Sequence, residues 1–345
     1  MSSSLATVEP AAGGEAPPLT ARVFNRRTIL WLMIAAAIVA VAVWRAPIDW
    51  GDAWHRITHA NPFLYLTALL IYWASFLVRD YRWHVLLANA GDRQPTRPLI
   101  GIVITSFFVN CVVPAKMGDV YRAYLARTKL RVSAAKALGT IIAERLLDLC
   151  VLMALLIAAG AVVFWHKAPQ ALVPYVIAGT TICLAGVGVI LAMRAGRGQR
   201  LLRLLPEAIF HRYESFRIGT VHSLARFPTL GVLTVLVWGC EAARLGFVVS
   251  ALGFGGLLGP SQFVVIALVA ALLTTIPFLP GGLGLVEAGM VGVLIAIGGV
   301  GREAALSIAL LDRSISYGSV VVVGFLVFLL IHVRHARPIP APAGG

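Results

Sequence analysis

The sequence predicts an all-α, polytopic protein of the inner membrane, on the basis of its composition and of the spacing of its apolar runs. Hydrophobic residues make up 59% of the 345 positions and charged residues 13%, whereas soluble domains carry about 25% charged residues. Along most of the chain, the apolar runs approach the roughly 20 residues that a membrane-spanning helix needs. This pattern argues against a water-soluble enzyme, a disordered protein and a secreted disulfide scaffold.

The net charge of +14 has a different meaning in a membrane protein than in a soluble one. In a soluble protein it would indicate nucleic-acid binding, but here it first indicates loops held on the cytoplasmic side. We therefore expect membrane lipids as partners and no nucleic acid. The four cysteines lie inside apolar runs without metal-ligand or redox spacing, so we expect no disulfide framework, no metal site and no cofactor.

A single membrane domain over residues 26–335 is expected between two tails, 1–25 and 336–345. The first tail is rich in Ser, Ala, Gly and Pro and has no hydrophobic periodicity, which is typical of disorder. A cluster of three arginines then precedes the first apolar run, an arrangement that a cleaved signal peptide would also show. The tail ahead of these cations is long for a signal peptide, so we expect the run to remain as a span.

Six runs are expected to cross the membrane, and two shorter ones to turn back inside it. The crossing runs are residues 29–44, 62–78, 137–165, 171–193, 229–252 and 304–332. The shorter runs each stop at a proline, Pro114 and Pro277. Because a helix can break at membrane depth only where protein or a cavity surrounds its backbone, we expect two re-entrant hairpins, at 99–130 and 261–300.

The distribution of Lys and Arg supports this topology and places the N-terminus in the cytoplasm. When both hairpins return to the side from which they enter, 22 of the 29 cations fall in cytoplasmic segments and 4 in outer segments. If the first hairpin crossed the membrane instead, the six cations between residues 116 and 136 would move outside. The positive-inside rule thus favours the re-entrant hairpins.

The two halves of the chain also look alike, which predicts an internal repeat. Matching positions 166 residues apart are Pro62 and Pro228, Pro114 and Pro280, and Gly118 and Gly284, and 168 residues separate Glu144-Arg145 from Asp312-Arg313. We expect repeat one at about 62–165 and repeat two at about 228–332, joined by a basic cytoplasmic loop at 194–228. In the expected topology the repeats have opposite orientations. Inverted repeats that each contain a broken hydrophobic segment point to a transporter with its substrate site where the broken segments meet.

Eight ionisable residues lie within the apolar runs, and their energetic cost demands pairing or a wet cavity. They are Glu144, Arg145, Asp148, Glu241, Arg244, Glu287, Asp312 and Arg313. Each costs about 2.5–3.5 kcal/mol at the centre of a helix on insertion scales. Glu144 and Asp148 share one helix face, repel each other and need a cation from another segment. The expected pairs are Glu144 and Asp148 with Arg313, Asp312 with Arg145 or Arg122, and Glu241 with Arg244. The alternative role of these charges is only to hold helices together.

The tips of the two hairpins carry the residues best suited to binding an anion. In the first hairpin these are Asn110, Lys116, Asp119 and Arg122, around the break marked by Pro114 and Gly118. Lys and Arg at a helix break, with its free backbone N–H groups, can hold a phosphate. The second hairpin has Pro277, Pro280, Gly281, Gly282, Gly284 and Glu287 in the corresponding segment. Its glycines allow left-handed backbone and close helix approach, or form a plain packing turn.

The candidate substrate-binding residues combine the hairpin tips with the charges inside the apolar runs. They are Asn110, Lys116, Asp119, Arg122, Glu144, Arg145, Asp148, Arg244, Glu287, Asp312 and Arg313. The basic loop after Arg194 alternates Arg with Leu, which is typical of an amphipathic segment on an anionic cytoplasmic leaflet.

Four motifs together resemble the flippase-like integral membrane family, the transmembrane region of lysylphosphatidylglycerol synthases and the UPF0104-type proteins. They are Arg79-Asp80-x-Arg82-Trp83, the Asn110/Pro114/Gly118-Asp119/Arg122 hairpin, Glu144-Arg145-x2-Asp148 and Pro280-Gly281-Gly282-x-Gly284-x2-Glu287. The resemblance implies a polytopic protein that handles a lipid or a polyisoprenoid-phosphate conjugate, typically by moving it between leaflets. In the fused synthases, aminoacyl transfer belongs to an additional soluble domain, and we expect a stand-alone member without that domain.

The expected function is a lipid flippase or transporter for an anionic phospholipid or a polyisoprenoid-phosphate-linked conjugate, rather than an enzyme. One alternative is a membrane-embedded transferase acting on a polyprenyl-phosphate lipid, with Asp119 or Glu287 as general base. Another alternative is a scaffold for envelope assembly. Partners that fit these roles are a second copy of the chain or enzymes of lipid biosynthesis.

Overall fold

The computed structural model describes residues 50–165, 173–197, 206–276 and 279–333. All of these residues belong to one compact unit. The predicted first span, both predicted tails and Pro277 lie outside the described residues.

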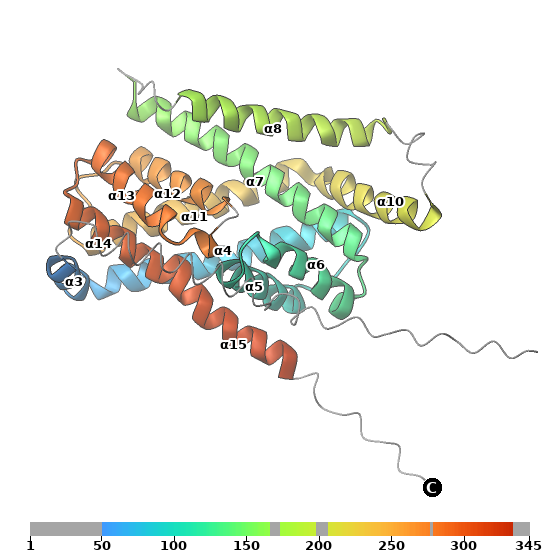
Figure 1. Cartoon of the computed structure of the whole chain (residues 1–345), viewed down its shortest axis with the longest axis horizontal. Coiled ribbons are helices and arrows are strands. Elements are labelled where there is room, and N and C mark those ends of the chain that lie inside the picture. The colour runs from blue at the N-terminus through green and yellow to red at the C-terminus, as the bar shows by residue number, and fades with distance from the viewer. Residues whose placement is uncertain (1–49, 166–172, 198–205, 277–278, 334–345) are drawn as a thin grey trace, which may run out of the picture. The chain divides into compact units, whose positions relative to one another are not determined.

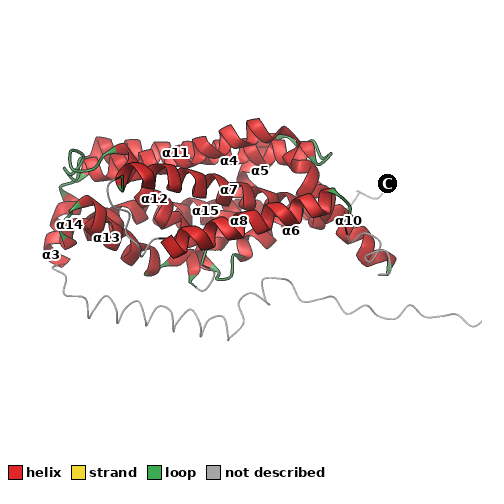
Figure 2. Cartoon of the chain, turned by 90° about the horizontal axis from the view of Figure 1, so that it is seen from above, coloured by secondary structure: helices red, strands yellow, loops and turns green. Residues whose placement is uncertain are grey.

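Every regular element in the described residues is a helix, and no strand occurs among them (Figures 1 and 2). The first half contains α3 (Trp50–Thr58), α4 (Pro62–Asn89), α5 (Thr96–Val112), α6 (Met117–Leu130), α7 (Ala134–Val163) and α8 (Val173–Arg194). The second half contains α10 (Glu207–Val221), η2 (His222–Arg226), α11 (Phe227–Ala251), α12 (Pro260–Thr274), η3 (Pro280–Gly282), α13 (Leu285–Gly298), α14 (Arg302–Arg313), the π-helical turn η4 (Ser314–Ser319) and α15 (Val320–Val333). The prediction of an all-α fold is confirmed for this part of the chain.

Six helical segments of the described chain are long and apolar enough to cross a membrane. They are Pro62–Asn89, Ala134–Val163, Val176–Arg194, Glu207–Ala251, Pro280–Gly298 and Arg302–Ile331. Five of them overlap predicted spans, whereas Pro280–Gly298 was predicted as the returning arm of the second hairpin. The two shorter apolar helices, α5 and α12, coincide with the predicted first arms of the hairpins. That the hairpins re-enter on one side stays a prediction.

The first helices of the two predicted repeats, α4 and α11, pack along each other and run antiparallel. The N–H of Asn61 donates to Ala251 O at 2.8 Å, which joins the start of α4 to the end of α11. Asn89 Nδ2 donates to Ser223 O at 2.8 Å, which joins the end of α4 to the turn before α11. Asn61 also caps α4 through its side-chain oxygen, ahead of Pro62 at the first helical position. Antiparallel first helices are what an inverted repeat requires, and the repeat itself stays a prediction.

Each short helix forms a hairpin with the helix that follows it and packs against the last helix of the other predicted repeat. We call α5 and α6 the first hairpin, and α12, η3 and α13 the second hairpin. Helix α5 contacts α15, and α12 contacts α7. The contact of α5 with α15 is close because Gly324 has no side chain, and a Cβ there would lie 2.4 Å from the Cβ of Phe108. The hairpins therefore tie the two halves together.

The basic loop predicted at 194–228 contains helix α10, which packs against α7. The approach is close at Gly139 and Gly219, where an added Cβ would lie 2.4 Å from Phe216 O and 2.1 Å from Lys136 O, respectively. Helix α8 packs mainly against α7 and α10 and leaves most of its side chains exposed, at the edge of this unit (Figure 1). Residues 198–205 lie outside the described part of the chain, so the predicted amphipathic segment is described only from α10 onward.

Three cations that the topology argument placed in cytoplasmic segments are buried among the helices. Arg79 and Arg82 belong to α4, which continues past the predicted end of its apolar run at Val78 as far as Asn89. Arg122 belongs to α6, and all three are at most 6% exposed. Without these three, 19 of the original 22 cations remain on the proposed cytoplasmic side against 4 outside, so the positive-inside argument keeps its sign.

Candidate functional site

The tips of the two hairpins share the same backbone conformation with different residues. In the first hairpin, Ala115 and Lys116 follow a proline and are left-handed, with φ of 63° and 54°. In the second hairpin, Gly281 and Gly282 follow the matching proline, with φ of 55° and 69°. The pairs stand 166 residues apart, which is the offset that relates the prolines. The expectation that glycines support left-handed backbone is confirmed in the second hairpin, while the first hairpin makes the same turn without glycine.

The first hairpin carries backbone strain at Lys116. Left-handed backbone costs a residue with a Cβ roughly 1–2 kcal/mol, whereas glycine adopts it readily. Strained residues persist only where the surrounding structure holds them, and they cluster at functional sites. A lysine at a position where the other half has glycine is therefore the leading candidate for a functional residue at the tips.

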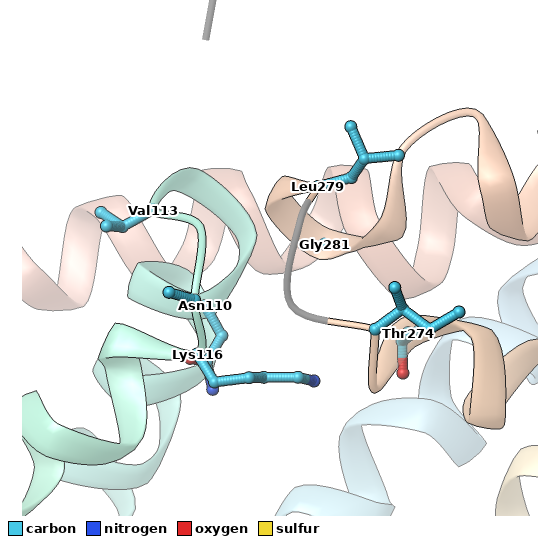
Figure 3. A pocket seen from close by; sticks show the side chains of 8 residues that line it. Asn110, Val113, Lys116, Thr274, Leu279 and Gly281 are labelled. Carbon is cyan, nitrogen blue, oxygen red and sulfur yellow. The ribbon is translucent and has the colours of Figure 1, made fainter. Parts of the chain in front are cut away.

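A small cavity lies between the two tips, and the Lys116 side chain points across it. The cavity is lined by Asn110, Val113, Ala115 and Lys116 from the first hairpin and by Thr274, Ile276, Leu279 and Gly281 from the second. Lys116 extends from the first hairpin toward Thr274 of the second (Figure 3). The cavity volume is about 10 Å³, which is room for about one water molecule. The tips are thus closed on each other.

Lys116 is a partly buried cation that no described carboxylate pairs with. Burial and repulsion from the nearby guanidinium of Arg145 lower the pKa of the Lys116 ammonium to about 8, against the smaller opposing effect of Asp119. The amine therefore carries its charge in neutral solution and loses it just above neutrality. An anion between the tips would supply the missing partner.

Six charged residues of the first half form the first charge cluster, behind the first hairpin. They are Arg82, Arg122, Arg145, Asp119, Glu144 and Asp148. Arg82 of α4 is 0% exposed and holds both acids of α7, with Nη2 at 2.9 Å from Glu144 Oε1 and 3.0 Å from Asp148 Oδ2. Its Nη1 also donates to Thr234 Oγ1 of α11 at 2.9 Å. The shared helix face of the two acids is confirmed by this common partner.

The other two arginines of the first charge cluster connect α7 to the first hairpin. Arg145 donates two hydrogen bonds to Asp119, from Nε at 2.9 Å and from Nη2 at 2.8 Å. Arg122 places Nη1 at 3.1 Å from Glu144 Oε2 and stacks on the ring of Trp83, 4.0 Å from its centroid. The hairpin is thereby fixed to the long helix that follows it.

The second charge cluster also contains three arginines and three carboxylates, and consists of Arg79, Arg244, Arg313, Glu241, Asp312 and Glu287. Arg244 of α11 pairs with Asp312 of α14, and with Glu241 on its own helix at 2.9 Å. The expected pairing of Glu241 with Arg244 is therefore confirmed. Arg79 of α4 reaches Glu241 at 2.7 Å, which is an ion pair between the two halves.

Arg313 connects α14 to the second hairpin. Its Nε donates to Glu287 Oε1 at 2.7 Å, and its Nη2 donates to Gly281 O at 2.8 Å. Glu287 in turn accepts a hydrogen bond from the N–H of Gly284 at 2.6 Å, and Gly284 has a φ of 83°. The second tip is thus held by its own ion pair, with no lysine.

The two clusters repeat one pairing scheme. Each predicted repeat contains an acid followed directly by an arginine, Glu144-Arg145 in one and Asp312-Arg313 in the other. The acid binds an arginine of the repeat's first helix: Glu144 binds Arg82 of α4, and Asp312 binds Arg244 of α11. The arginine of that pair binds the acid of the returning helix, through Arg145 with Asp119 and through Arg313 with Glu287. Each cluster contains three guanidinium groups and three carboxylates, so both are formally neutral.

The expected pairs between the acids of one half and the arginines of the other are wrong. Glu144 and Asp148 meet Arg82 rather than Arg313, because α4 and not α14 faces them. Asp312 meets Arg244 rather than Arg145 or Arg122. The acid-Arg neighbours point in different directions on their helices and so reach different partners within their own half.

Asn110 and Gly118 shape the first hairpin from within. Asn110 Oδ1 accepts a hydrogen bond from the Gly118 N–H at 2.8 Å, and Asn110 Nδ2 donates to Asp119 at 3.3 Å. Ser106 Oγ donates to Gly118 O at 2.9 Å, and an added Cβ at Gly118 would lie 2.0 Å from Ser106 O. The amide of Asn110 therefore holds the turn, and Gly118 permits the arms to approach.

The sequence reasoning did not count Arg79 and Arg82 among the site residues, although both are central to the clusters. They were treated as loop cations because the apolar run ends at Val78. No Gly or Pro occurs between Val78 and Asn89, and this absence of helix-stop signals favoured a longer helix.

The fold and the site together define a polytopic, all-helical membrane protein with two apolar hairpins and buried ion-pair clusters. More particularly, the chain belongs to the family of the lysylphosphatidylglycerol synthase transmembrane region, since the model of that family matches residues 32–324.

Relatives of the chain include UPF0104 membrane proteins and a glycosyltransferase of archaea. The UPF0104 membrane protein of Methanocaldococcus jannaschii is 30% identical over 225 residues, which cover 65% of this chain and 94% of the relative. A UPF0104 membrane protein of Methanothermobacter thermautotrophicus is 24% identical over 88% of this chain and 93% of the relative. Glycosyltransferase AglD of Haloferax volcanii is 25% identical over 90% of this chain but only 55% of its own length.

Proposed function

We propose that the chain is a lipid flippase or transporter, which moves an anionic phospholipid or a polyisoprenoid-phosphate-linked conjugate between the leaflets of the inner membrane. The observation that carries the proposal is Lys116, a strained cation without a carboxylate partner among the described residues, at the meeting point of the two hairpins. The family takes its name from a synthase of a phospholipid, which supports a phospholipid as cargo.

The charge balance of the site explains why Lys116 would receive the headgroup. Moving an anion out of water is unfavourable unless a counter-charge meets it. The guanidinium groups of both charge clusters already face an equal number of carboxylates. Lys116 is the cation at the tips that remains to neutralise a phosphate, while the acyl or prenyl tails stay in the bilayer.

Transport through this site requires the hairpins to separate. The cavity of about 10 Å³ is too small for a lipid headgroup. Tyr317 connects the two tips. Its hydroxyl donates a hydrogen bond to Cys111 O of the first hairpin at 3.3 Å. Arg313, four residues before Tyr317, donates to Gly281 O of the second hairpin. Separation of the tips would break the Tyr317 hydrogen bond and the packing of α5 on η3, while the ion pairs keep each hairpin attached to its own charge cluster.

The transferase alternative needs a general base, and both candidate carboxylates are occupied. Burial alone would raise the pKa of Asp119, but the charge and hydrogen bonds of Arg145 lower it to about 2. A group with such a pKa takes up a proton poorly near neutral pH. Glu287 is bound by Arg313 and by the Gly284 N–H. These contacts favour a role in holding the hairpins.

Transport is tested with purified full-length protein in vesicles that contain fluorescent phosphatidylglycerol, using an impermeant reductant that destroys only the outer label. Wild-type protein is expected to expose the inner label to the reductant. Lys116→Gly should slow this exposure by about tenfold or more, which corresponds to about 1.4 kcal/mol on the barrier. The same variant should unfold no more easily than wild type, because glycine relieves roughly 1–2 kcal/mol of strain.

Two control variants test whether the rate depends on a positive charge at position 116. Lys116→Arg keeps the cation and should retain most of the rate, while Lys129→Ala removes a cation from the other end of α6 and should change nothing. A folded Lys116→Gly protein that exposes lipid at the wild-type rate would contradict the proposal. Chemical alteration of the lipid by the protein alone would instead favour the transferase.

A further inference from the structure

Asp80 of α4 is a buried carboxyl group that belongs to neither charge cluster. It is 6% exposed. No described residue donates a hydrogen bond to its Oδ1, and no described Lys, Arg or His lies within the 4.0 Å of an ion pair. Each of the six carboxylates in the clusters, by contrast, meets at least one guanidinium group. A largely buried carboxylate without a counter-charge is disfavoured unless it is neutralised.

A cation close to this part of α4 is Arg122, on the returning arm of the first hairpin. Arg122 is 0% exposed and stacks on Trp83, which lies three residues after Asp80 and therefore on the same face of α4. Its guanidinium is close to Glu144, but none of its nitrogens is aligned for a hydrogen bond with a described residue. Two buried groups on neighbouring helices thus have hydrogen-bonding capacity that the described residues leave unused.

Other ionisable groups lie on α4 and on the elements packed against it, and the charged ones near Asp80 are mostly paired. Those of α7 and α11 near this region, together with Arg79 and Arg82 of α4 itself, pair within the two charge clusters. On α4 itself, His84 lies one turn after Asp80, and its Nδ1 is 2.7 Å from Gln94 O. Lys136 of α7 pairs with Asp92. The remaining ones on the packed elements are Arg97 and Cys111 of α5, Cys150 of α7, His222 and Arg226 of η2, Cys240 of α11 and Tyr317 of η4. Arg122 is therefore the group that competes for Asp80.

We propose that Asp80 is a proton-binding site, and that its protonation decides whether Arg122 pairs with Glu144 alone or also with Asp80. In the binding step, the Asp80 carboxylate takes a proton from hydronium to give a carboxylic acid and water, and no other bond changes. With Asp80 neutral, Arg122 pairs with Glu144, which is the arrangement in the structure. With Asp80 ionised, the attraction draws Arg122 toward α4.

Movement of Arg122 would affect Lys116, the proposed anion-binding residue, through helix α6. Arg122 and Lys116 lie at the start of the same helical arm, six residues apart. A shift of Arg122 toward Asp80 moves the arm that carries the tip, so proton release and headgroup access become linked. In this respect the inference rests on the proposed function and adds a source of energy to it.

The proton site is tested on the purified full-length protein by infrared difference spectroscopy over a pH series. Wild-type protein is expected to show the carbonyl stretch of a buried carboxylic acid, and Asp80→Asn should lose it. Asp92→Asn is the matched control, because Asp92 pairs with Lys136 at 2.9 Å and should leave the band unchanged. A spectrum in which Asp80→Asn keeps the band overturns the proposal. If Asp80→Asn does not fold, Asp80→Glu should shift the band, and an unshifted band overturns the proposal equally.

The link to transport is tested in the labelled vesicles with and without a pH gradient. Wild-type lipid flux should respond to the gradient, while Asp80→Asn should move lipid without that response. A folded Asp80→Asn protein that still responds to the gradient overturns the link. If wild-type protein moves no lipid at all, the proposed function fails, and the infrared result alone then decides whether Asp80 binds a proton.

Discussion

The two hairpins have matching backbones and opposite chemistry at their tips. In the first hairpin, Lys116 has a strained left-handed backbone and carries a charge. In the second hairpin, the corresponding residue is Gly282, which adopts the same backbone without strain and has no charge. The second tip is instead bound by Arg313 through a backbone carbonyl. The comparison teaches that the ion pairs are the part common to both halves and hold the architecture, while the lysine is the part that differs and is the better candidate for contact with cargo.

If the two charge clusters stabilise the fold equally, removal of Arg82 from α4 and removal of Arg244 from α11 should lower the free energy of unfolding by similar amounts. Arg82→Met leaves Glu144 and Asp148 without their main partner, and Arg244→Met does the same to Asp312. We expect each change to lower the free energy of unfolding by about 3–5 kcal/mol, because a buried charge loses its counter-charge. Denaturation in mixed micelles, followed by tryptophan fluorescence, measures this loss.

The control for these changes is Arg56→Met, in an exposed pair with Asp52 at 2.9 Å. This change should cost less than about 1 kcal/mol. A large loss for only one of the two buried arginines would show that the halves are not equivalent.

The hairpins should also differ in why they need their matching glycines. At Gly118 an added Cβ would lie 2.0 Å from a backbone carbonyl of α5, so Gly118→Ala should destabilise by about 1–3 kcal/mol or more. Gly284 has a φ of 83°, and Gly284→Ala should cost roughly 1–2 kcal/mol through strain. Gly160→Ala, in open space on α7, should be neutral or stabilising. Thermal unfolding of the three variants gives the ranking, and equal effects at Gly118 and Gly160 would contradict the packing argument.

The charge on Lys116 should give transport a pH dependence that the second hairpin cannot supply. Because the pKa of Lys116 is about 8, the amine is protonated below that pH and neutral above it. With equal pH on both sides of the vesicles, the rate should halve near pH 8 and fall by about tenfold for each further unit. Bound anion shifts this midpoint upward, since it favours the charged form.

Lys116→Arg should remove this fall in rate, because the guanidinium stays charged throughout. The same profile in wild type and Lys116→Arg would assign the pH dependence to another group.

The smallest loss of stability is expected from breaking the hydrogen bond between Tyr317 and Cys111 O at the hairpin tips. Tyr317→Phe removes one hydrogen bond to Cys111 O and should lower stability by about 0.5–1.5 kcal/mol. If closure limits opening of the hairpins, the variant should move lipid faster than wild type. A slower rate would show that Tyr317 takes part in handling the cargo.

Much of the fold follows from local rules that the sequence displays. Pro114 follows the end of α5, Pro280 begins the turn η3 of the second hairpin, and the left-handed backbone at Gly281 is a conformation that glycine adopts more readily than other residues. The four-residue spacing of Glu144 and Asp148 places both on one face, as a single arginine that binds both confirms.

The partners of the buried charges could not be read from the same spacing. Periodicity fixes which face of a helix a residue occupies, but not which helix lies opposite. Arg82 was misplaced for a related reason, since a charged residue ended the apolar run without ending the helix. Left-handed backbone at Lys116 was equally hidden, because a residue with a Cβ gives no local signal for it.

The antiparallel packing of α4 and α11 also has an electrostatic consequence. Each helix is equivalent to about half a positive charge at its start and half a negative charge at its end. Since the start of α4 is bonded to the end of α11, and the end of α4 to the turn before α11, opposite ends meet and their fields largely cancel. This helix pair therefore presents almost no net dipole to charged groups that lie beside it.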